Sequence, residues 1–225
     1  MSEWLRDSLA FCRTYWWAIV ALVVPIAALR EFILINLGWN TMAAGINAIP
    51  PGFLWGMLTL LLLESFLQIS LILLVQGVLS KQDAGIAQRS SRALVMMLPF
   101  IMMQLMMGFG VAAGAVAFIV PGIYILVRWL LAPYFLLLQN QGALASLKSS
   151  WQYSRGYAWD LFFGLLITTL VSLAPTVFML DAANNDTVLL SNAVLSILSS
   201  VLGAWSVVLF YRAFDYVQAN PRFID

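Results

Sequence analysis

Residues 108–160 read GFGVAAGAVAFIVPGIYILVRWLLAPYFLLLQNQGALASLKSSWQYSRGYAWD. An apolar segment ends near Phe118, a Pro121-Gly122 break follows, and a second apolar segment contains Arg128. The stretch then becomes polar and basic, with aromatic residues interleaved. This order predicts two membrane-spanning helices joined by a tight turn, followed by a helix that lies on the membrane surface. The rest of the chain follows the same plan.

The composition is that of a membrane protein. Of the 225 residues, 63% are hydrophobic and 9% are charged, and the mean hydropathy is +0.93. Soluble domains carry about 25% charged residues, so we expect one integral membrane domain over residues 1–225. The chain has no histidine and a single cysteine, Cys12, which argues against a metal centre, a disulfide or a cofactor. The net charge of +1 argues against nucleic acid as a partner.

Six segments are long enough to cross a bilayer, whose core requires about 20 apolar residues per helix. They lie at about 16–37, 53–79, 93–118, 123–138, 161–180 and 188–210. The expected fold is therefore all-α, with about six transmembrane helices in three hairpins. Pro133 is expected to kink the fourth span and Pro175 to break the fifth. We interpret the first span as an uncleaved anchor, because Glu3 and Asp7 precede it and no small-residue cleavage site follows.

Two stretches between the spans are predicted to be short amphipathic helices on the membrane surface, at 2–15 and within 139–160. The apolar positions of the second helix recur at i, i+3 and i+7 and are Leu144, Leu147 and Trp151. Its other side carries Lys148, Gln152 and Arg155. We expect Lys148, Trp151 and Arg155 to contact anionic lipid headgroups, since basic and aromatic residues gather at that boundary.

The distribution of basic residues predicts the orientation, because lysine and arginine favour the cytoplasmic side. Nine of the 11 basic residues lie on one side of the six predicted spans. They are Arg6, Arg13, Lys81, Arg89, Arg92, Lys148, Arg155, Arg212 and Arg222. The other two are Arg30, at an outer end, and Arg128, inside a span. Both termini are therefore expected in the cytoplasm.

A weak internal repeat is visible. Arg13-Thr14-Tyr15 and Arg155-Gly156-Tyr157 each precede a span, and each is followed by a tryptophan. Each predicted hairpin also has proline near its outer turn, at Pro50-Pro51, Pro121 and Pro175. Repeats are common in membrane folds, so three units of a surface element, a span, a turn and a second span are one interpretation. The alternative is that interfacial aromatic residues and the basic bias create the similarity on their own.

Two charged residues inside spans are candidates for function, because ionisable groups in a bilayer are costly. Arg128 lies seven positions after Pro121, about 10 Å below the outer surface. The alternative is a structural arginine that snorkels or binds carbonyl oxygens of a neighbouring helix. Glu64 lies near the midplane, about 18 Å along the helix from Gly52. A Glu64–Arg128 ion pair and a protonated Glu64 are further alternatives.

Small residues in the third span form a Gly-x-x-x-Gly pattern at Gly110 and Gly114. Small residues at this spacing let two helices approach closely. We expect the partner helix to lie in the same chain, and a homodimer interface is the alternative, so the oligomeric state stays open.

Two further patterns have weaker functional interpretations. Met102 and Met106, like Met103 and Met107, are four residues apart. Such thioethers can bind Cu(I), but methionine is also a common filler of apolar gaps, which is the interpretation we favour. Asn185-Asp186-Thr187 is a formal glycosylation sequon, on the predicted outer side.

With these residues in place, the chain resembles the YciC-like family of uncharacterised bacterial inner-membrane proteins. It also resembles the related membrane domain attached to some glycerophosphodiester phosphodiesterases. The resemblance is densest in VPGIY (120–124), VRW (127–129), ASLKSSW (145–151) and Arg155-Gly156. It implies a multi-pass protein of the bacterial inner membrane and carries over no biochemical activity.

Three functions remain open at this point. About 70 residues lie outside the spans, too few for a soluble catalytic domain, and the chain has no nucleotide-binding or hydrolase motif, so we expect no enzyme. The first hypothesis is a structural or accessory protein of membrane or envelope homeostasis, with lipid headgroups and a membrane protein as partners. The second is a transporter or lipid-handling protein with Arg128 near an anionic headgroup. The third is a membrane anchor for a soluble enzyme.

Overall fold

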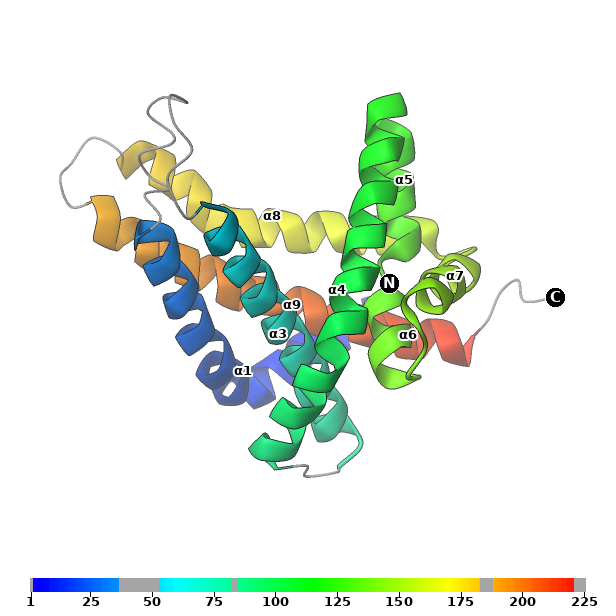
Figure 1. The fold of residues 1–225 in the computed structure, drawn as a ribbon. Helices are drawn as coiled ribbons and strands as arrows, with labels where there is room; N and C mark the ends of the chain where they lie inside the picture. Colours follow the sequence, from blue (N-terminus) through cyan, green and yellow to red (C-terminus); the bar gives the residue numbers. More distant parts are fainter. Residues whose placement is uncertain (1, 37–52, 82–84, 183–187, 221–225) are drawn as a thin grey trace.

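The computed structural model describes residues 2–36, 53–81, 85–182 and 188–220, and the regular structure in these ranges is helical. The helices are α1 (Ser2–Asn36), α3 (Phe53–Leu79), α4 (Ile86–Ala117), α5 (Ile119–Trp129), α6 (Ala132–Leu138), α7 (Ala143–Tyr153), α8 (Ala158–Ala182) and α9 (Val188–Ala219) (Figure 1). The predicted all-α fold is confirmed.

Six stretches within these helices are long and apolar enough to cross a membrane. They are Trp4–Asn36, Phe53–Leu79, Gln88–Ala117, Ile119–Leu138, Ala158–Pro175 and Ala193–Ala219. The chain is therefore a multi-pass membrane protein, as its hydropathy predicts. The turns at Pro50-Pro51 and the sequon at Asn185 lie outside the described residues.

Helix α1 contains both the predicted surface helix and the first span. The two parts meet at Tyr15, whose backbone is not helical (φ −108°, ψ 22°). The first part packs against the end of α9, where Trp4 stacks on Tyr216 with ring centroids 6.4 Å apart. In the same contact, Trp205 Nε1 donates a hydrogen bond of 3.0 Å to Ser8 Oγ.

The fourth span is divided into α5 and α6 by a turn at Leu130-Leu131. Pro133 lies in the first turn of α6, where the missing proline N–H would have no helical partner anyway. Instead of the kink expected at Pro133, a turn interrupts the helix just before this residue. The break expected at Pro175 was wrong, because α8 continues as a helix through Pro175 to Ala182. Neighbouring turns in membrane helices can satisfy the backbone groups that a proline leaves free.

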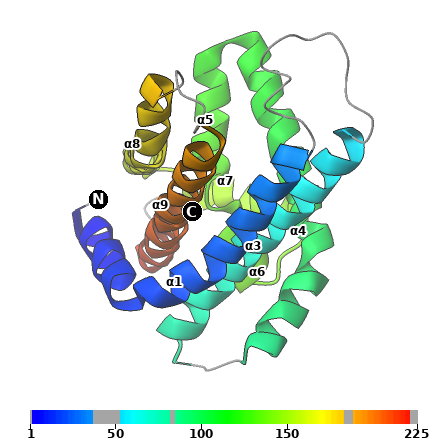
Figure 2. The same ribbon diagram turned by 90° about the vertical axis from the view of Figure 1, so that its left-hand side faces the viewer.

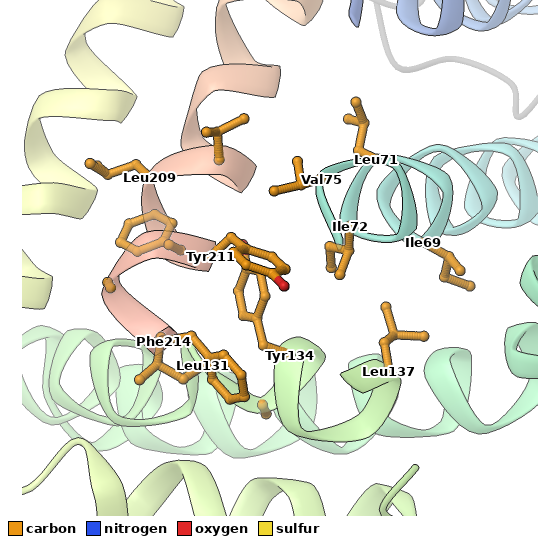
Figure 3. Packing of buried hydrophobic residues seen from close by; sticks show 14 of the residues in the cluster. Ile69, Leu71, Ile72, Val75, Leu131, Tyr134, Leu137, Leu209, Tyr211 and Phe214 are labelled. Carbon is orange, nitrogen blue, oxygen red and sulfur yellow. The ribbon is translucent and has the colours of Figure 1, made fainter. Parts of the chain in front are cut away.

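The buried core lies at one end of the molecule and is built mainly from the second half of α3, α6 and the second half of α9. In Figure 3, Tyr134 of α6 and Tyr211 of α9 point toward each other, with Ile72 and Val75 of α3 on the facing side. The two tyrosine rings meet edge to face, 6.1 Å apart. The Tyr134 hydroxyl donates to the Val207 carbonyl oxygen at 2.9 Å, which satisfies its polar end inside the core.

Away from this core the helices diverge. Helices α4 and α5 lie side by side and project away from α8 and α9 (Figure 1), and α1 and α3 run next to each other on another side (Figure 2). Helix α1 contacts α9 more extensively than it contacts α3. Large apolar side chains cover the diverging parts, among them Val116 and Val120, which are 89% and 76% exposed. Apolar exposure of this kind suits helices that face lipid. The division into three hairpins stays a prediction.

Candidate functional site

Arg128 lies in the last turn of α5 and is 3% exposed. Its Nη2 donates a hydrogen bond to the carbonyl oxygen of Trp151, in the last turn of α7. The guanidinium also lies over the Trp151 ring, 4.8 Å from the centroid, and 5.9 Å from that of Tyr124. A cation at a helix C-terminus is favourable because the final carbonyl oxygens carry partial negative charge. Arg128 therefore holds the end of α7 against α5.

The backbone of Arg128 is held from the opposite direction. Its carbonyl oxygen accepts hydrogen bonds from Ser150 Oγ at 2.8 Å and from Ser154 Oγ at 3.1 Å. Because α5 ends here, this carbonyl has no partner in the next turn. Ser146, Ser150 and Ser154 are fully buried, and their small side chains let α7 approach closely. The residues that carry the family resemblance therefore lie around this contact. This is the geometry expected if Arg128 is a structural arginine that binds a carbonyl oxygen of a neighbouring helix.

Glu64 and Arg128 do not form an ion pair. The ion pair that the described residues contain joins Arg30 Nη2 to Glu31 Oε1 at 2.9 Å. Arg128 is directed at the end of α7, whereas Glu64 lines a cavity beside Arg30. The Glu64–Arg128 ion pair, one of the alternatives from the sequence, is therefore not formed.

Helix α7 is amphipathic, as predicted, but the face that it buries is not the predicted one. Lys148, Trp151 and Arg155 are exposed on one side of it, with Trp151 at 37%. Of the expected apolar stripe, Leu147 is buried, but Leu144 is 69% exposed and shares the outer side. The reason is that the serines, which permit a short helix–helix distance, occupy the inner face. The outer face therefore combines two basic and two apolar side chains.

Gly110 and Gly114 pack against a helix of the same chain. A Cβ at Gly110 would overlap the ring of Trp129 in α5. A Cβ at Gly114 would lie 2.8 Å from Ile125 Cδ1 and 3.0 Å from Gly122 Cα. These glycines therefore bring α4 and α5 together, and no second copy is needed to explain them.

The methionines of α4 divide between two environments. Met103 is fully buried in the core, and Met107 is partly buried beside it. Met102 and Met106 are 55% and 39% exposed on the outside. Within the described residues, His, Cys, Asp and Glu form no group of three that could hold a metal ion.

Two adjoining cavities lie among the spans. The first, called here the α1 cavity, has a volume of about 290 Å³ and lies between α1, α3 and α9. Its lining is Arg30, Glu64, Leu67, Gln68, Leu71, Ser199, Ser200, Gly203, Ala204, Ser206 and Val207. A charged pair of opposite sign and several hydroxyl and amide groups therefore face one space inside the membrane region.

The second cavity, called here the α8 cavity, has a volume of about 380 Å³ and lies between α3, α4, α6, α8 and α9. Its lining is Gln68, Ile72, Met103, Gln104, Met107, Leu130, Pro133, Tyr134, Leu165, Thr168, Thr169, Ser172, Leu173, Ser206, Val207 and Phe210. Most of these side chains are apolar. Gln68, Ser206 and Val207 line both cavities, so these residues form a wall that the two cavities share.

Hydrogen bonds fix the walls of the cavities. Gln104 Nε2 of α4 donates to Gln68 Oε1 of α3 at 2.9 Å, and Ser65 Oγ donates to Gln104 Oε1 at 3.2 Å. On the other side, Arg30 Nη2 donates to Ser196 Oγ at 2.7 Å, which donates to Glu31 Oε1 at 2.6 Å. The first set joins α3 to α4, and the second joins α1 to α9. The polar side chains at the cavities are therefore positioned before any ligand arrives.

Sequence reasoning found Glu64 but missed Gln68, Gln104 and the serines of α9. The available signal was their position inside apolar spans, because polar side chains there face the protein interior or a cavity. The groups in the cavities can donate and accept hydrogen bonds and compensate charge. They are suited to binding, and the histidine-free chain offers them no imidazole base.

No protein-family model matches the chain, and neither a curated protein nor a solved structure is significantly similar to it. The resemblance to the YciC-like family therefore stays a prediction.

Proposed function

We propose that this chain is a non-enzymatic, multi-pass protein of the bacterial inner membrane that binds an amphiphilic ligand, such as a lipid, between its spans. The observation that carries the proposal is the pair of adjoining cavities that share Gln68, Ser206 and Val207 in their linings. The α1 cavity contains the charged side chains Arg30 and Glu64, whereas the lining of the α8 cavity is uncharged and mostly apolar. An amphiphile has a polar part next to an apolar part, as the two adjoining cavities do. Ligand-binding sites also place a few polar groups within an apolar lining.

This proposal moves the headgroup site away from Arg128. The guanidinium of Arg128 is buried against α7 and lines neither cavity. Arg30 and Glu64 face the α1 cavity instead. The lipid-handling hypothesis is kept, with a different set of residues.

The orientation is part of the proposal. We place both termini and α7 in the cytoplasm and arrange the six spans as three hairpins. The support is the basic bias between the spans, together with the exposed Lys148 and Arg155 on α7. The cavities then open within the membrane, with Arg30 toward the outer side.

The test is ligand retention by a protein in which a larger side chain fills the wall that the cavities share. Ser206 lines both cavities, so the ring in Ser206→Phe should occupy ligand space. Thr59, exposed on the outside of α3, provides the control Thr59→Phe with a similar added volume. Native mass spectrometry of protein released from lipid nanodiscs should show a bound amphiphile in the parent and the control, reduced about tenfold in Ser206→Phe, the effect of about 1.4 kcal/mol. Release of the bare parent chain, or equal retention by both variants, would refute the proposal.

A second function is favoured by the outer face of α7. Leu144 and Trp151 can insert at the bilayer boundary while Lys148 and Arg155 meet anionic headgroups. This surface supports an accessory role in membrane or envelope homeostasis, in which the protein senses or organises the cytoplasmic leaflet, with or without a membrane-protein partner. It is compatible with ligand binding, because the two surfaces share no residue.

A further inference from the structure

We infer that the polar end of the ligand is a zwitterion that carries a primary ammonium next to an anionic phosphate, held by Glu64 and Arg30 in the α1 cavity. The inference rests on the proposed function and specifies the chemical class of its ligand. The ligand class is therefore a phospholipid with an aminoethyl-type headgroup, with its acyl chains directed into the α8 cavity.

The charge of the α1 cavity selects a cation. Arg30 is compensated by Glu31, its neighbour in the ion pair. Glu64 has no ion-pair partner within the described residues, and it is exposed to the cavity. A carboxylate inside the membrane region is costly unless it is paired. A cationic group on the ligand removes that cost, so Glu64 is the ammonium-binding group.

The same cavity also offers a site for an anion. Within the described residues, Arg30 donates its hydrogen bonds through Nε and Nη2, which leaves Nη1 available to a ligand. Arginine is the side chain best suited to phosphate oxygens, because its planar donors match their geometry. A phosphate next to the ammonium therefore has a donor within the same lining.

The lining distinguishes a primary ammonium from a quaternary one. Sites for quaternary ammonium use aromatic rings, and the residues that form the α1 cavity include no aromatic side chain. They offer hydrogen-bond acceptors instead, and a primary ammonium has three N–H donors. The carboxylate of Glu64 and the hydroxyl oxygen of Ser200 are two such acceptors.

The cavity volumes also favour the headgroup in the α1 cavity and the acyl chains in the α8 cavity. At about 30 Å³ per water molecule, the 290 Å³ of the α1 cavity holds a headgroup but not a whole lipid. The chains must therefore lie outside the α1 cavity, past Ser206 and Val207, which line both cavities. There they meet Ile72, Leu165 and Phe210 in the α8 cavity.

The experiment compares headgroups in one bilayer. The full-length protein is placed in nanodiscs of equal parts phosphatidylethanolamine, phosphatidylcholine and phosphatidylglycerol with identical chains, and the lipids it retains are identified by native mass spectrometry. The parent should retain phosphatidylethanolamine over the other two by about tenfold, the effect expected of one charge-assisted hydrogen bond. Glu64→Gln should lose this preference while still retaining lipid. Asp160→Asn, which removes a negative charge outside both cavities, should keep it.

The outcomes separate this inference from the proposed function. Retention of lipid by the parent without headgroup preference, or an unchanged preference in Glu64→Gln, would overturn the inference and leave the amphiphile site standing. A preference for phosphatidylcholine would overturn the argument from the missing aromatic rings. Soluble phosphoethanolamine, added to detergent-purified protein, should raise the Tm much less than the lipid does. An equal rise would overturn the assignment of the chains to the α8 cavity.

Discussion

Replacing Arg128 with glutamine should release α7 from the end of α5. Glutamine is uncharged and shorter, so it can neither reach the Trp151 carbonyl oxygen nor lie over the Trp151 ring as the guanidinium does. The Ser150 and Ser154 hydroxyls would still bond to the backbone of residue 128. The variant therefore removes one side of the contact and leaves the other in place.

The magnitude follows from the lost contacts. A hydrogen bond from a charged donor contributes about 1.5–3 kcal/mol, and a desolvated cation–π contact contributes about 2 kcal/mol or less. Part of this is offset, since burying the guanidinium has a cost of its own. We expect a net loss of about 3 kcal/mol, which corresponds to a fall in Tm of about 5–10 °C for a chain of this size.

The assay is amide hydrogen exchange of the protein in zwitterionic nanodiscs, read at the α7 amides. A loss of about 3 kcal/mol in local stability should speed exchange there by about 100-fold, with little change in α9. Arg155→Gln, in the same zwitterionic nanodiscs, is the matched control, because Arg155 is exposed beside α7 and has no anionic lipid to contact there, and surface substitutions usually change stability by less than about 0.5 kcal/mol. Lipid retention should be the same in both variants.

The reasoning would be refuted by the opposite pattern. If Arg128→Gln abolished lipid retention while α7 exchanged no faster than in Arg155→Gln, Arg128 would be a ligand-binding residue. The contact with α7 would then be incidental, and the hypothesis that places Arg128 near the headgroup would be restored.

Three further predictions concern the helix contacts, the surface and the orientation. Gly110→Ala should lower stability by about 1–3 kcal/mol in thermal unfolding, because the added methyl group would overlap Trp129. Gly108→Ala is the control: it has open space around it and should be neutral or stabilising by up to about 1 kcal/mol. Changing both Lys148 and Arg155 to glutamine should remove about 2 kcal/mol of the stabilisation that anionic nanodiscs give over zwitterionic ones; equal stabilisation before and after would count against the headgroup contact. A Gln152→Cys variant in a cysteine-free background should react with an impermeant maleimide only after the inner membrane is opened, and labelling of intact spheroplasts from outside would contradict the cytoplasmic placement of α7.

The apolar spans, the helical character of the two short amphipathic segments and the break before Pro133 could be predicted from sequence because their causes are local. Hydropathy reports burial in lipid along one segment at a time. Proline removes a donor at a known position, so a break near Pro133 follows from its own chemistry. The same rule was wrong at Pro175, where α8 continues, because neighbouring groups decide whether a membrane helix tolerates proline.

The buried face of α7 and the cavities could not be predicted, because they depend on contacts between distant segments. A serine such as Ser150 is equally suited to water and to a close helix contact, and only the position of α5 decides between them. The apolar side chains of α3 lie on all sides of the helix, so their periodicity does not tell which side faces the protein. The proximity of Arg30 and Glu64 depends on how α1 and α3 pack against α9.

Two arginines lie near aromatic rings of the short amphipathic helices. Arg128 lies over Trp151 of α7, and Arg212, near the end of α9, lies 6.0 Å from the ring centroid of Phe11 in the first part of α1. The internal repeat stays a prediction.

A third arginine contact joins α4 to the same end of the molecule. Arg92 Nη2 donates to the Leu137 carbonyl oxygen at the end of α6, at 3.1 Å. Arginines thus tie helix ends together through carbonyl oxygens and aromatic rings, whereas Arg30, paired with Glu31, lines the α1 cavity.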